Sequence, residues 1–424
     1  MNTRNKPVRR IRDIMKSPKL RAKKERPIVH KGVNQGGLGR ALDRCKNIAD
    51  LRLLAKKRLP APMFHYIDGG ADDELTLRWN TAAFDRYELL PGYLRDIAAI
   101  DTSTKLLGQR IEVPFFLSPT GMSRLFHHEK EIAAARAADQ LGTFYTLSTL
   151  GTTSLEDIAQ ATASPKMFQV YILKDRGLTR EFVQRCKAAA YEAMCLTVDV
   201  PVAGNREREI EHGMHMPPKF RLGSLMSFAA HPGWSIRYLL NPDFKLANVA
   251  HRVDALGSGA MGLIEYVNSQ FDRSVTWKDA EWLVQEWGGP MVIKGLQTVE
   301  DARRARDIGA RGIMVSNHGG RQLETAPAPI DCIADIADAV GDDLDVICDG
   351  GVRRGTHIIK ALAMGARAVS FGRPYLYGLA AGGYKGVLRA LSLIRAELAR
   401  DMALIGCRSL EELSPDHVRR HPGG

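Results

Sequence analysis

The chain has 424 residues, 45% of them hydrophobic and 25% charged, which is the composition of an ordinary globular protein able to bury a large core. Its formal net charge is +12, but residues 1–31 hold twelve Lys and Arg against Asp13 and Glu25, so the remaining body is nearly neutral. This balance gives no support for nucleic-acid binding outside the tail, and no apolar run reaches the roughly 20 residues of a membrane-spanning helix.

We expect residues 1–40 to form a basic, disordered tail. Two other interpretations stay open. Residues 1–31 could be attracted to a surface of anionic lipid, since each Lys or Arg near such a surface contributes about 1 kcal/mol. The Arg-rich, acid-poor character of this segment also permits a cleaved targeting peptide.

The domain that follows is expected over residues 41–415, with a helical extension at its start. Asn47 or Asp50 could cap a short helix whose apolar positions recur at helical spacing. Pro60 and Pro62 would end this helix, because proline cannot continue it.

One pattern repeats from about residue 111: a β-branched or apolar run is followed by a stretch with helical period. Near-continuous apolar runs are typical of parallel strands that are covered on both faces. Eight such units favour a (β/α)8 TIM barrel over a doubly wound open sheet, because PTGMSRLF after the first strand is not a glycine-rich fingerprint. The predicted strands are 114–120, 143–149, 167–172, 193–200, 290–295, 312–317, 345–351 and 368–374, and helices are predicted at 128–142, 298–310 and 354–366.

A long insertion, residues 207–260, interrupts the pattern after the fourth strand. It mixes aromatic, Met, Leu and basic residues with no clear period. It is either a long active-site loop with its own packing or an amphipathic segment that enters a membrane surface, because Lys219 and Arg221 flank an apolar stretch containing Trp234. Residues 416–424, after the barrel, are expected to form a C-terminal tail.

Polar residues stand at the C-terminal ends of the predicted strands. The most unusual string is SNHGGRQLE, residues 316–324, which follows the apolar run RGIMV. The C-terminal ends of barrel strands meet at one mouth, where TIM-barrel enzymes place their chemistry. We therefore interpret the string as part of a catalytic site.

His318 is the candidate base, because an imidazole titrates near neutrality. Asp199, from the fourth strand, could orient it and stabilise its protonated form. Arg321 could hold a substrate carboxylate with two hydrogen bonds. No Cys/His cluster presents itself in the sequence, so no metal site is predicted.

Two loops indicate an anion site. DGGVRRG (349–355) follows the seventh strand and FGRP (371–374) the eighth. They supply glycines for close backbone approach and arginines for phosphate contact. Many TIM barrels bind phosphate after these two strands, so a phosphorylated ligand is expected.

These motifs, together with LTVDV (196–200) and VIKG (292–295) in this order, closely resemble the FMN-dependent enzymes that oxidise L-2-hydroxy acids. The resemblance runs from about residue 45 to 415. It implies a TIM barrel with FMN at its mouth, in agreement with the strand pattern.

The resemblance also implies roles for particular side chains. His318 would take a proton from the substrate as C2 gives its electrons to the flavin, with Asp199 as its partner. Tyr171 would contact the substrate hydroxyl, and Lys294 would place positive charge where the reduced flavin becomes negative. The substrate-binding positions would be Tyr66, Arg206 and Arg321, and the FMN-binding positions Pro119, Thr120, Gly121, Ser148, Gln169, Thr197, Lys294, Asp349, Gly351, Arg353, Gly372 and Arg373.

Two positions depart from the pattern of glycolate oxidases. Gly121 stands where those oxidases have Ala, and Leu150 where they have Trp, which widens the pocket. Both favour a dehydrogenase that passes electrons to a quinone or another carrier, and a substrate side chain larger than that of glycolate.

The resemblance therefore implies FMN-dependent oxidation of a lactate- or mandelate-like L-2-hydroxy acid to the 2-oxo acid. The alternatives are an oxidase that releases hydrogen peroxide, and a non-catalytic flavin-binding or interaction protein. We expect a homotetramer, cytoplasmic or peripheral on the inner membrane, with membrane contact through 1–31 or 207–260. The unpaired spacing of the six cysteines fits a reducing compartment.

Overall fold

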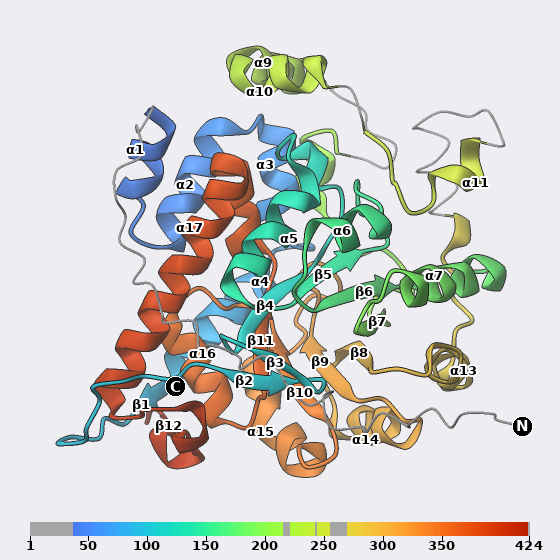
Figure 1. The fold of residues 1–424 in the computed structure, drawn as a ribbon. Coiled ribbons are helices and arrows are strands. Elements are labelled where there is room, and N and C mark those ends of the chain that lie inside the picture. Colours follow the sequence, from blue (N-terminus) through green and yellow to red (C-terminus); the bar gives the residue numbers. More distant parts are fainter. Residues whose placement is uncertain (1–36, 215–220, 242–243, 255–268, 423–424) are drawn as a thin grey trace, which may run out of the picture.

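The barrel at the centre of the molecule is built from the predicted strands (Figure 1). The computed structural model describes residues 37–214, 221–241, 244–254 and 269–422. Within these ranges, eight parallel strands close into a barrel in the order β10-β11-β4-β5-β6-β7-β8-β9. The strands are β4 (Phe115–Thr120), β5 (Tyr145–Ser148), β6 (Lys166–Val170), β7 (Ala193–Thr197), β8 (Met291–Leu296), β9 (Gly312–Ser316), β10 (Asp345–Asp349) and β11 (Ala368–Phe371). The TIM barrel is confirmed.

Helices pack around the outside of the barrel, as βα units require. The stretches predicted at 128–142, 298–310 and 354–366 form α5, α14 and α16. The last helix is interrupted at Gly382–Gly383, where the backbone leaves helical geometry. The surrounding helices are α5 (Lys130–Leu141), α6 (Leu155–Ala161), α7 (Arg176–Ala188), α13 (Trp277–Trp287), α14 (Val299–Asp307), α15 (Pro329–Val340), α16 (Gly355–Ala363) and α17 (Arg373–Ile405).

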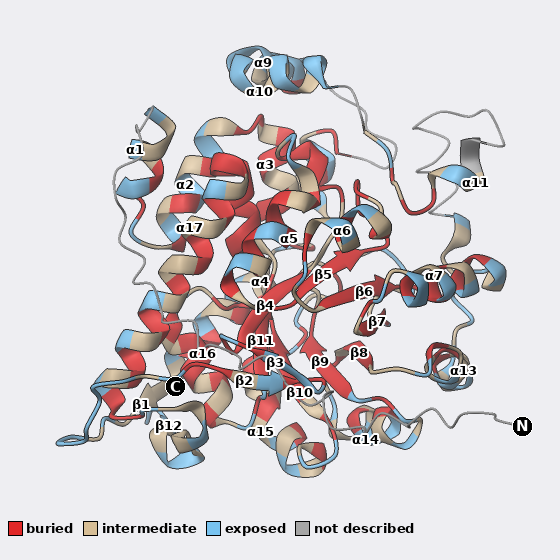
Figure 2. Cartoon of the chain, viewed as in Figure 1, coloured by how far each residue is buried: buried red, intermediate tan, exposed pale blue. Residues whose placement is uncertain are grey.

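A hairpin fills the N-terminal end of the barrel. Its strands, β2 (Thr104–Leu106) and β3 (Gln109–Ile111), pair antiparallel. Their buried apolar side chains form one cluster with side chains near the starts of the barrel strands, including Phe116 and Met167. Figure 2 shows the barrel strands mostly buried. The polar strand ends therefore face the opposite end of the barrel.

Helices also precede the barrel. Of the two predicted caps, Asn47 is the one that begins a helix: its side-chain oxygen accepts a hydrogen bond from the backbone N–H of Asp50 at 2.9 Å. The expected tail reached residue 40, but the first described helix already begins at Gly37 and buries Leu42; residues 1–36 lie outside the described residues. The elements are α1 (Gly37–Arg44), α2 (Ile48–Arg58), α3 (Ala61–Asp68), α4 (Leu75–Ala82), η1 (Ala83–Arg86) and β1 (Tyr87–Leu89).

The C-terminal tail expected over residues 416–424 contains a strand instead. β12 (Val418–Arg420) pairs antiparallel with β1, after the short turns η3 (Leu410–Glu412) and η4 (Pro415–His417). The sequence VRR has no apolar alternation, and its pairing partner lies near the start of the domain. A pattern read locally could therefore not reveal this strand.

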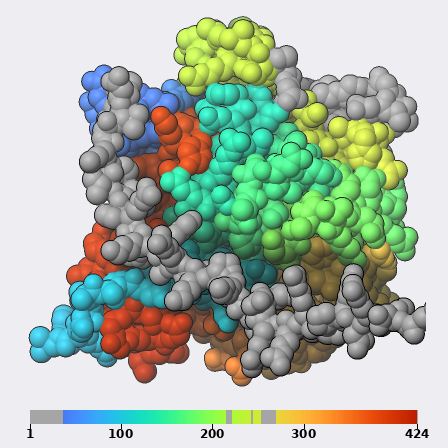
Figure 3. Space-filling model, in the orientation of Figure 1, coloured from blue at the N-terminus to red at the C-terminus, as the bar shows by residue number. Residues whose placement is uncertain are grey.

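The described part of the insertion has three portions. α8 (Glu207–Glu211) packs against α3, and α11 (Ala250–Asp254) lies at the far end. Between them, α9 (Leu222–Ala230) and α10 (Pro232–Leu240) form a helical hairpin that projects beyond the barrel (Figures 1 and 3). The insertion is thus mainly helical where it is described, and Lys219 lies outside the described residues.

The helical hairpin α9–α10 is attached to the barrel by specific contacts. Trp234 stacks on Phe228, with ring centroids 5.5 Å apart, and its Nε1 donates a hydrogen bond to the backbone oxygen of Leu125 at 2.9 Å. The backbone N–H of Ala61 donates to Oγ of Ser227 at 2.8 Å. In the described part of the chain, no helix combines the length and hydropathy that crossing a bilayer requires.

Candidate active site

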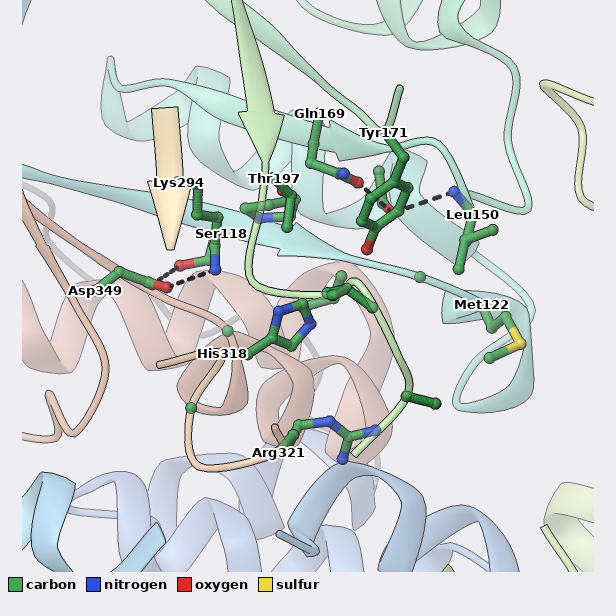
Figure 4. A pocket seen from close by; sticks show the side chains of 18 of the residues that line it. Ser118, Met122, Leu150, Gln169, Tyr171, Thr197, Lys294, His318, Arg321 and Asp349 are labelled. Carbon is green, nitrogen blue, oxygen red and sulfur yellow. Dashed lines mark hydrogen bonds and ion pairs between the residues drawn. The ribbon is translucent and has the colours of Figure 1, made fainter. Parts of the chain in front are cut away.

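A cavity of about 950 Å³ opens at the C-terminal ends of the barrel strands. With one exception, every site residue predicted from the sequence lines it. The exception is Asp199, which lies behind His318 and reaches the cavity through that imidazole. Figure 4 shows how side chains from separate strands and from the loops that follow them lie around this space, among them Lys294 of β8 and both His318 and Arg321 of the loop after β9.

The loop after β9 has an unusual backbone. His318, Gly319 and Gly320 have φ values of 57°, 67° and 72°, so three consecutive residues adopt the left-handed conformation. A Cβ at position 320 would lie 2.5 Å from the backbone nitrogen of Leu77, so glycine is required there. For histidine this conformation is strained, and such strain is characteristic of functional sites. The two glycines after the strand thus serve to aim His318.

His318 and Asp199 form a hydrogen-bonded pair. Nδ1 of His318 lies 3.0 Å from Oδ1 of Asp199, and the two side chains are 25% and 11% exposed. Burial lowers the pKa of His318 below its ordinary 6.5, although Asp199 acts to raise it. For Asp199, burial acts to raise the pKa, but the charges of His318 and Lys294 bring it below its ordinary value. A neutral imidazole that donates from Nδ1 keeps a lone pair on Nε2, so the pair can accept a proton.

Lys294 is held by a buried network that the sequence did not predict. Its Nζ lies 2.9 Å from Oγ of Ser316 and 3.2 Å from Oδ2 of Asp349. Asp349 in turn accepts hydrogen bonds from the hydroxyls of Ser118, Ser316 and Ser370 at 2.6–2.7 Å. Burial acts to lower the pKa of Lys294, but the carboxylates raise it overall, so the ammonium stays charged. The serines are small polar residues inside apolar strands, which was the available signal.

Two arginines and a tyrosine form the side of the cavity next to α3 and α8. The guanidinium of Arg321 lies 5.1 Å from the ring centre of Tyr66, and its Nη1 donates to the backbone oxygen of Tyr66 at 2.7 Å. Nη2 of Arg206 donates to Oε1 of Gln322 at 3.2 Å. The carboxylate of Glu209, which the sequence analysis did not single out, lies beside both guanidiniums. This wall carries the donors that a ligand carboxylate needs.

Tyr171 also lines the cavity and supplies a hydroxyl. Its ring lies edge-on to Phe271, with centroids 4.9 Å apart. Burial raises the pKa of Tyr171, so its hydroxyl stays protonated and can donate a hydrogen bond.

Gly121 and Leu150, the two departures from the oxidase pattern, are neighbours. A Cβ at position 121 would lie 3.0 Å from Cβ of Leu150, and the backbone oxygen of Leu150 accepts from the N–H of Met122 at 2.9 Å. A side chain at 121 would therefore push on Leu150. Both residues line the cavity.

The sequence matches the FMN-dependent dehydrogenase family over residues 55–420. The chain belongs to this family. L-lactate oxidase from a Nostoc species is 43% identical over 371 residues, which are 87% of this chain and 96% of that protein. L-lactate dehydrogenase from Acinetobacter baumannii is 39% identical over 368 residues, with 87% and 96% covered. The crystal structure of the monotopic membrane protein (S)-mandelate dehydrogenase has a TM-score of 0.85 at 34% identity and covers 89% of this chain and 100% of that chain.

As a member of the FMN-dependent dehydrogenase family, the protein is an oxidoreductase whose cofactor is FMN. The cavity fits a flavin ring. Nε2 of Gln169 and Oγ1 of Thr197 are buried and have no hydrogen-bond partner within the described ranges. Both residues line the cavity, and the carbonyl and N–H groups of a flavin would satisfy them.

The residues that were predicted to bind the phosphate of FMN also line this cavity. Gly372 and Arg373 stand at the N-terminus of α17, where backbone N–H groups favour an anion. Burial, together with the nearby charges of Arg321 and Arg353, lowers the pKa of Arg373 to about 10, and a bound phosphate would relieve this. A Cβ on Gly351 would collide with the backbone oxygen of Asn80, so only glycine fits. These residues would hold the phosphate of FMN.

Proposed function

We propose that the protein oxidises an L-2-hydroxy acid, lactate- or mandelate-like, to the 2-oxo acid. The observation that carries the proposal is the His318–Asp199 pair, whose imidazole faces a cavity that also contains a carboxylate-binding wall. The relatives named L-lactate oxidase and L-lactate dehydrogenase support the substrate class. Leu150, which lines the cavity where glycolate oxidases carry the larger Trp, supports a substrate side chain larger than hydrogen.

Each side chain then has a task in the reaction. Arg321, Arg206 and Tyr66 hold the substrate carboxylate, and the hydroxyl of Tyr171 donates to the substrate oxygen. Nε2 of His318 accepts a proton from the substrate, and Asp199 stabilises the imidazolium that results. FMN, when bound, would supply the acceptor for the two electrons and the second proton that leave the substrate. Lys294 places a buried positive charge next to the cavity, where it stabilises negative charge that develops.

Anaerobic titration with a panel of L- and D-2-hydroxy acids tests the substrate class. We expect L-lactate or L-mandelate to bleach the flavin absorbance and the D-enantiomers to do so at least about 100-fold more slowly. A site that contacts the substrate at three points binds only one enantiomer in a reactive orientation. Bleaching by none of the acids would contradict the proposal and favour a flavin-binding protein without turnover. Equal rates of bleaching by both enantiomers would contradict the assigned substrate site.

The acceptor that we propose is a quinone or another carrier, with O2 as the alternative. Gly121 supports this choice, because it is the position where glycolate oxidases carry alanine. Hydrogen peroxide measured per turnover in air distinguishes the two. We expect well below one peroxide per oxo acid formed when a soluble quinone is present; one peroxide per turnover would make the protein an oxidase.

We also propose that the helical hairpin α9–α10 rests on a membrane. It exposes large apolar side chains: Leu222, Leu225, Met226, Ile236, Leu239 and Leu240 are 55–75% exposed. Residues 222–240 contain no Asp or Glu, and Arg221 and Arg237 stand beside the apolar surface. The neighbour (S)-mandelate dehydrogenase, a monotopic membrane protein, supports this assignment. A peripheral position on the inner membrane would place the site beside a quinone pool.

Sedimentation with vesicles checks the membrane contact. We expect L239D/L240D to lower vesicle binding more than tenfold, since burying a Leu side chain contributes about 1.5–3 kcal/mol. Leu404→Asp, at a residue that is 64% exposed on α17, is the matched control and should bind as the wild type does. Binding of the full chain and of a chain without residues 1–31 is compared on vesicles of anionic phosphatidylglycerol and of neutral phosphatidylcholine. This comparison distinguishes the contribution of the tail from that of the hairpin. Unchanged binding of L239D/L240D would remove the hairpin from the contact.

The assembly that we propose, from the family resemblance, is a homotetramer. Light scattering of the FMN-loaded protein measures this directly, and a monomer would contradict it.

A further inference from the structure

A buried carboxylate stands between the two arginines of the substrate wall. Glu209, on α8, has a side chain that is 5% exposed. Its Oε1 lies 2.9 Å from Nη2 of Arg321, and its Oε2 lies 3.9 Å from Nη1 of Arg206. The contact with Arg321 lacks the geometry of a hydrogen bond, so it is a contact between charges.

The positive charges of the two guanidiniums repel each other, and the negative charge of Glu209 offsets this repulsion. Burial lowers the pKa of Arg206, and the charge of Arg321 lowers it further, whereas Glu209 acts to raise it. Both arginines are largely buried, with 14% of Arg321 and 22% of Arg206 exposed. Unbalanced buried charge is costly. Two cations and one anion leave one net positive charge, which a single carboxylate neutralises.

We infer that Glu209 is a positioning residue that sets the charge of the carboxylate site, so that ligands with one negative charge are favoured over ligands with two. This inference rests on the proposed function, because it takes Arg206 and Arg321 as the pair that binds the substrate carboxylate. The first carboxylate of a dianion neutralises the one net positive charge of Arg206, Arg321 and Glu209. Its second carboxylate is then repelled by Glu209, and these three side chains have no positive charge left to offset that repulsion. Glu209 thereby selects hydroxy acids with an uncharged side chain.

The test compares propionate with malonate, which have equally long carbon chains but differ by one charge. Both are fully ionised at about pH 8. Each acid is titrated into the FMN-loaded protein, and its Kd is read from the change in the flavin absorbance spectrum. E209Q is expected to raise the ratio of the propionate Kd to the malonate Kd about tenfold, because one unit charge a few Å away contributes at least that factor at an effective dielectric constant of about 20.

The ratio separates charge from misalignment. Any displacement of Arg321 in the variant weakens the binding of both acids, so its effect cancels in the ratio of their Kd values. Glu209→Asp keeps the charge, and Glu211→Gln removes an exposed charge from the same helix; both should keep the wild-type ratio. R206Q/E209Q leaves one net positive charge at the site, so its ratio of Kd values should equal that of the wild type. This double variant is measured in place of E209Q if E209Q is unstable.

An unchanged ratio in E209Q overturns the inference, and so does a tenfold change in R206Q/E209Q. Failure of both acids to bind the wild-type protein is a different result. It would refute the carboxylate site itself, and the proposed function with it.

Discussion

Replacing His318 by glutamine is expected to leave FMN bound and to slow flavin reduction by L-lactate or L-mandelate by about 10³–10⁴-fold, the contribution of a well-placed general base. Glutamine has a similar size and polarity, so the cavity should persist, but it cannot accept a proton at Nε2. Anaerobic stopped-flow absorbance measures the rate. His251→Gln, at a histidine that is 46% exposed on α11, is the control and should react as the wild type does.

The pH dependence of the same rate provides a second measurement. Because burial lowers the pKa of His318, the imidazole stays neutral down to pH values below 6.5. Protonation removes the lone pair, so the rate should be level above this value and fall on the acidic side. A fall that began well above pH 6.5, or undiminished reduction in H318Q, would remove His318 from the proposed chemistry.

Replacing Arg321 by methionine is expected to raise the KM for the hydroxy acid about 100-fold or more. Loss of one partner of a buried, hydrogen-bonded charge pair costs 2–5 kcal/mol in comparable sites. The variant also exposes the substrate carboxylate to Glu209, which lies 2.9 Å from the missing guanidinium. Steady-state kinetics over a range of L-lactate concentrations measure the effect.

Arg321→Lys is the informative comparison, since it keeps the charge but loses the fork that binds both carboxylate oxygens. We expect a KM between those of the wild type and the methionine variant. A KM in R321M equal to that of the wild type would refute a carboxylate-binding role.

The barrel was predictable because its strands are buried on both faces. Runs such as PFFLSPT and AMCLTVDV carry apolar residues almost without interruption, and each begins within one residue of an observed strand. The mouth was predictable for a related reason: parallel strands bring their C-terminal ends together, so polar residues there must converge. This argument placed His318, Lys294 and Gln169 around one cavity.

Other features depend on contacts that a local pattern does not contain. Glu209 looks like any acidic residue of the string EREIE, and only folding against α3 buries it beside Arg321. Ser118 and Ser370 belong to different strands, and their shared contact with Asp349 exists only in the closed barrel. The helical hairpin α9–α10 escaped prediction because its apolar residues face outward, so they do not follow the period of a core-facing helix.

The hairpin of β2 and β3 that fills the start of the barrel has a kinetic consequence. Because that end is filled by apolar side chains, we expect the hydroxy acid and the electron acceptor to enter the same cavity, at the other end of the barrel. We expect the 2-oxo acid to leave before the electron acceptor binds, so that turnover divides into two half-reactions of the ping-pong type. Double-reciprocal plots at several acceptor concentrations should then run parallel.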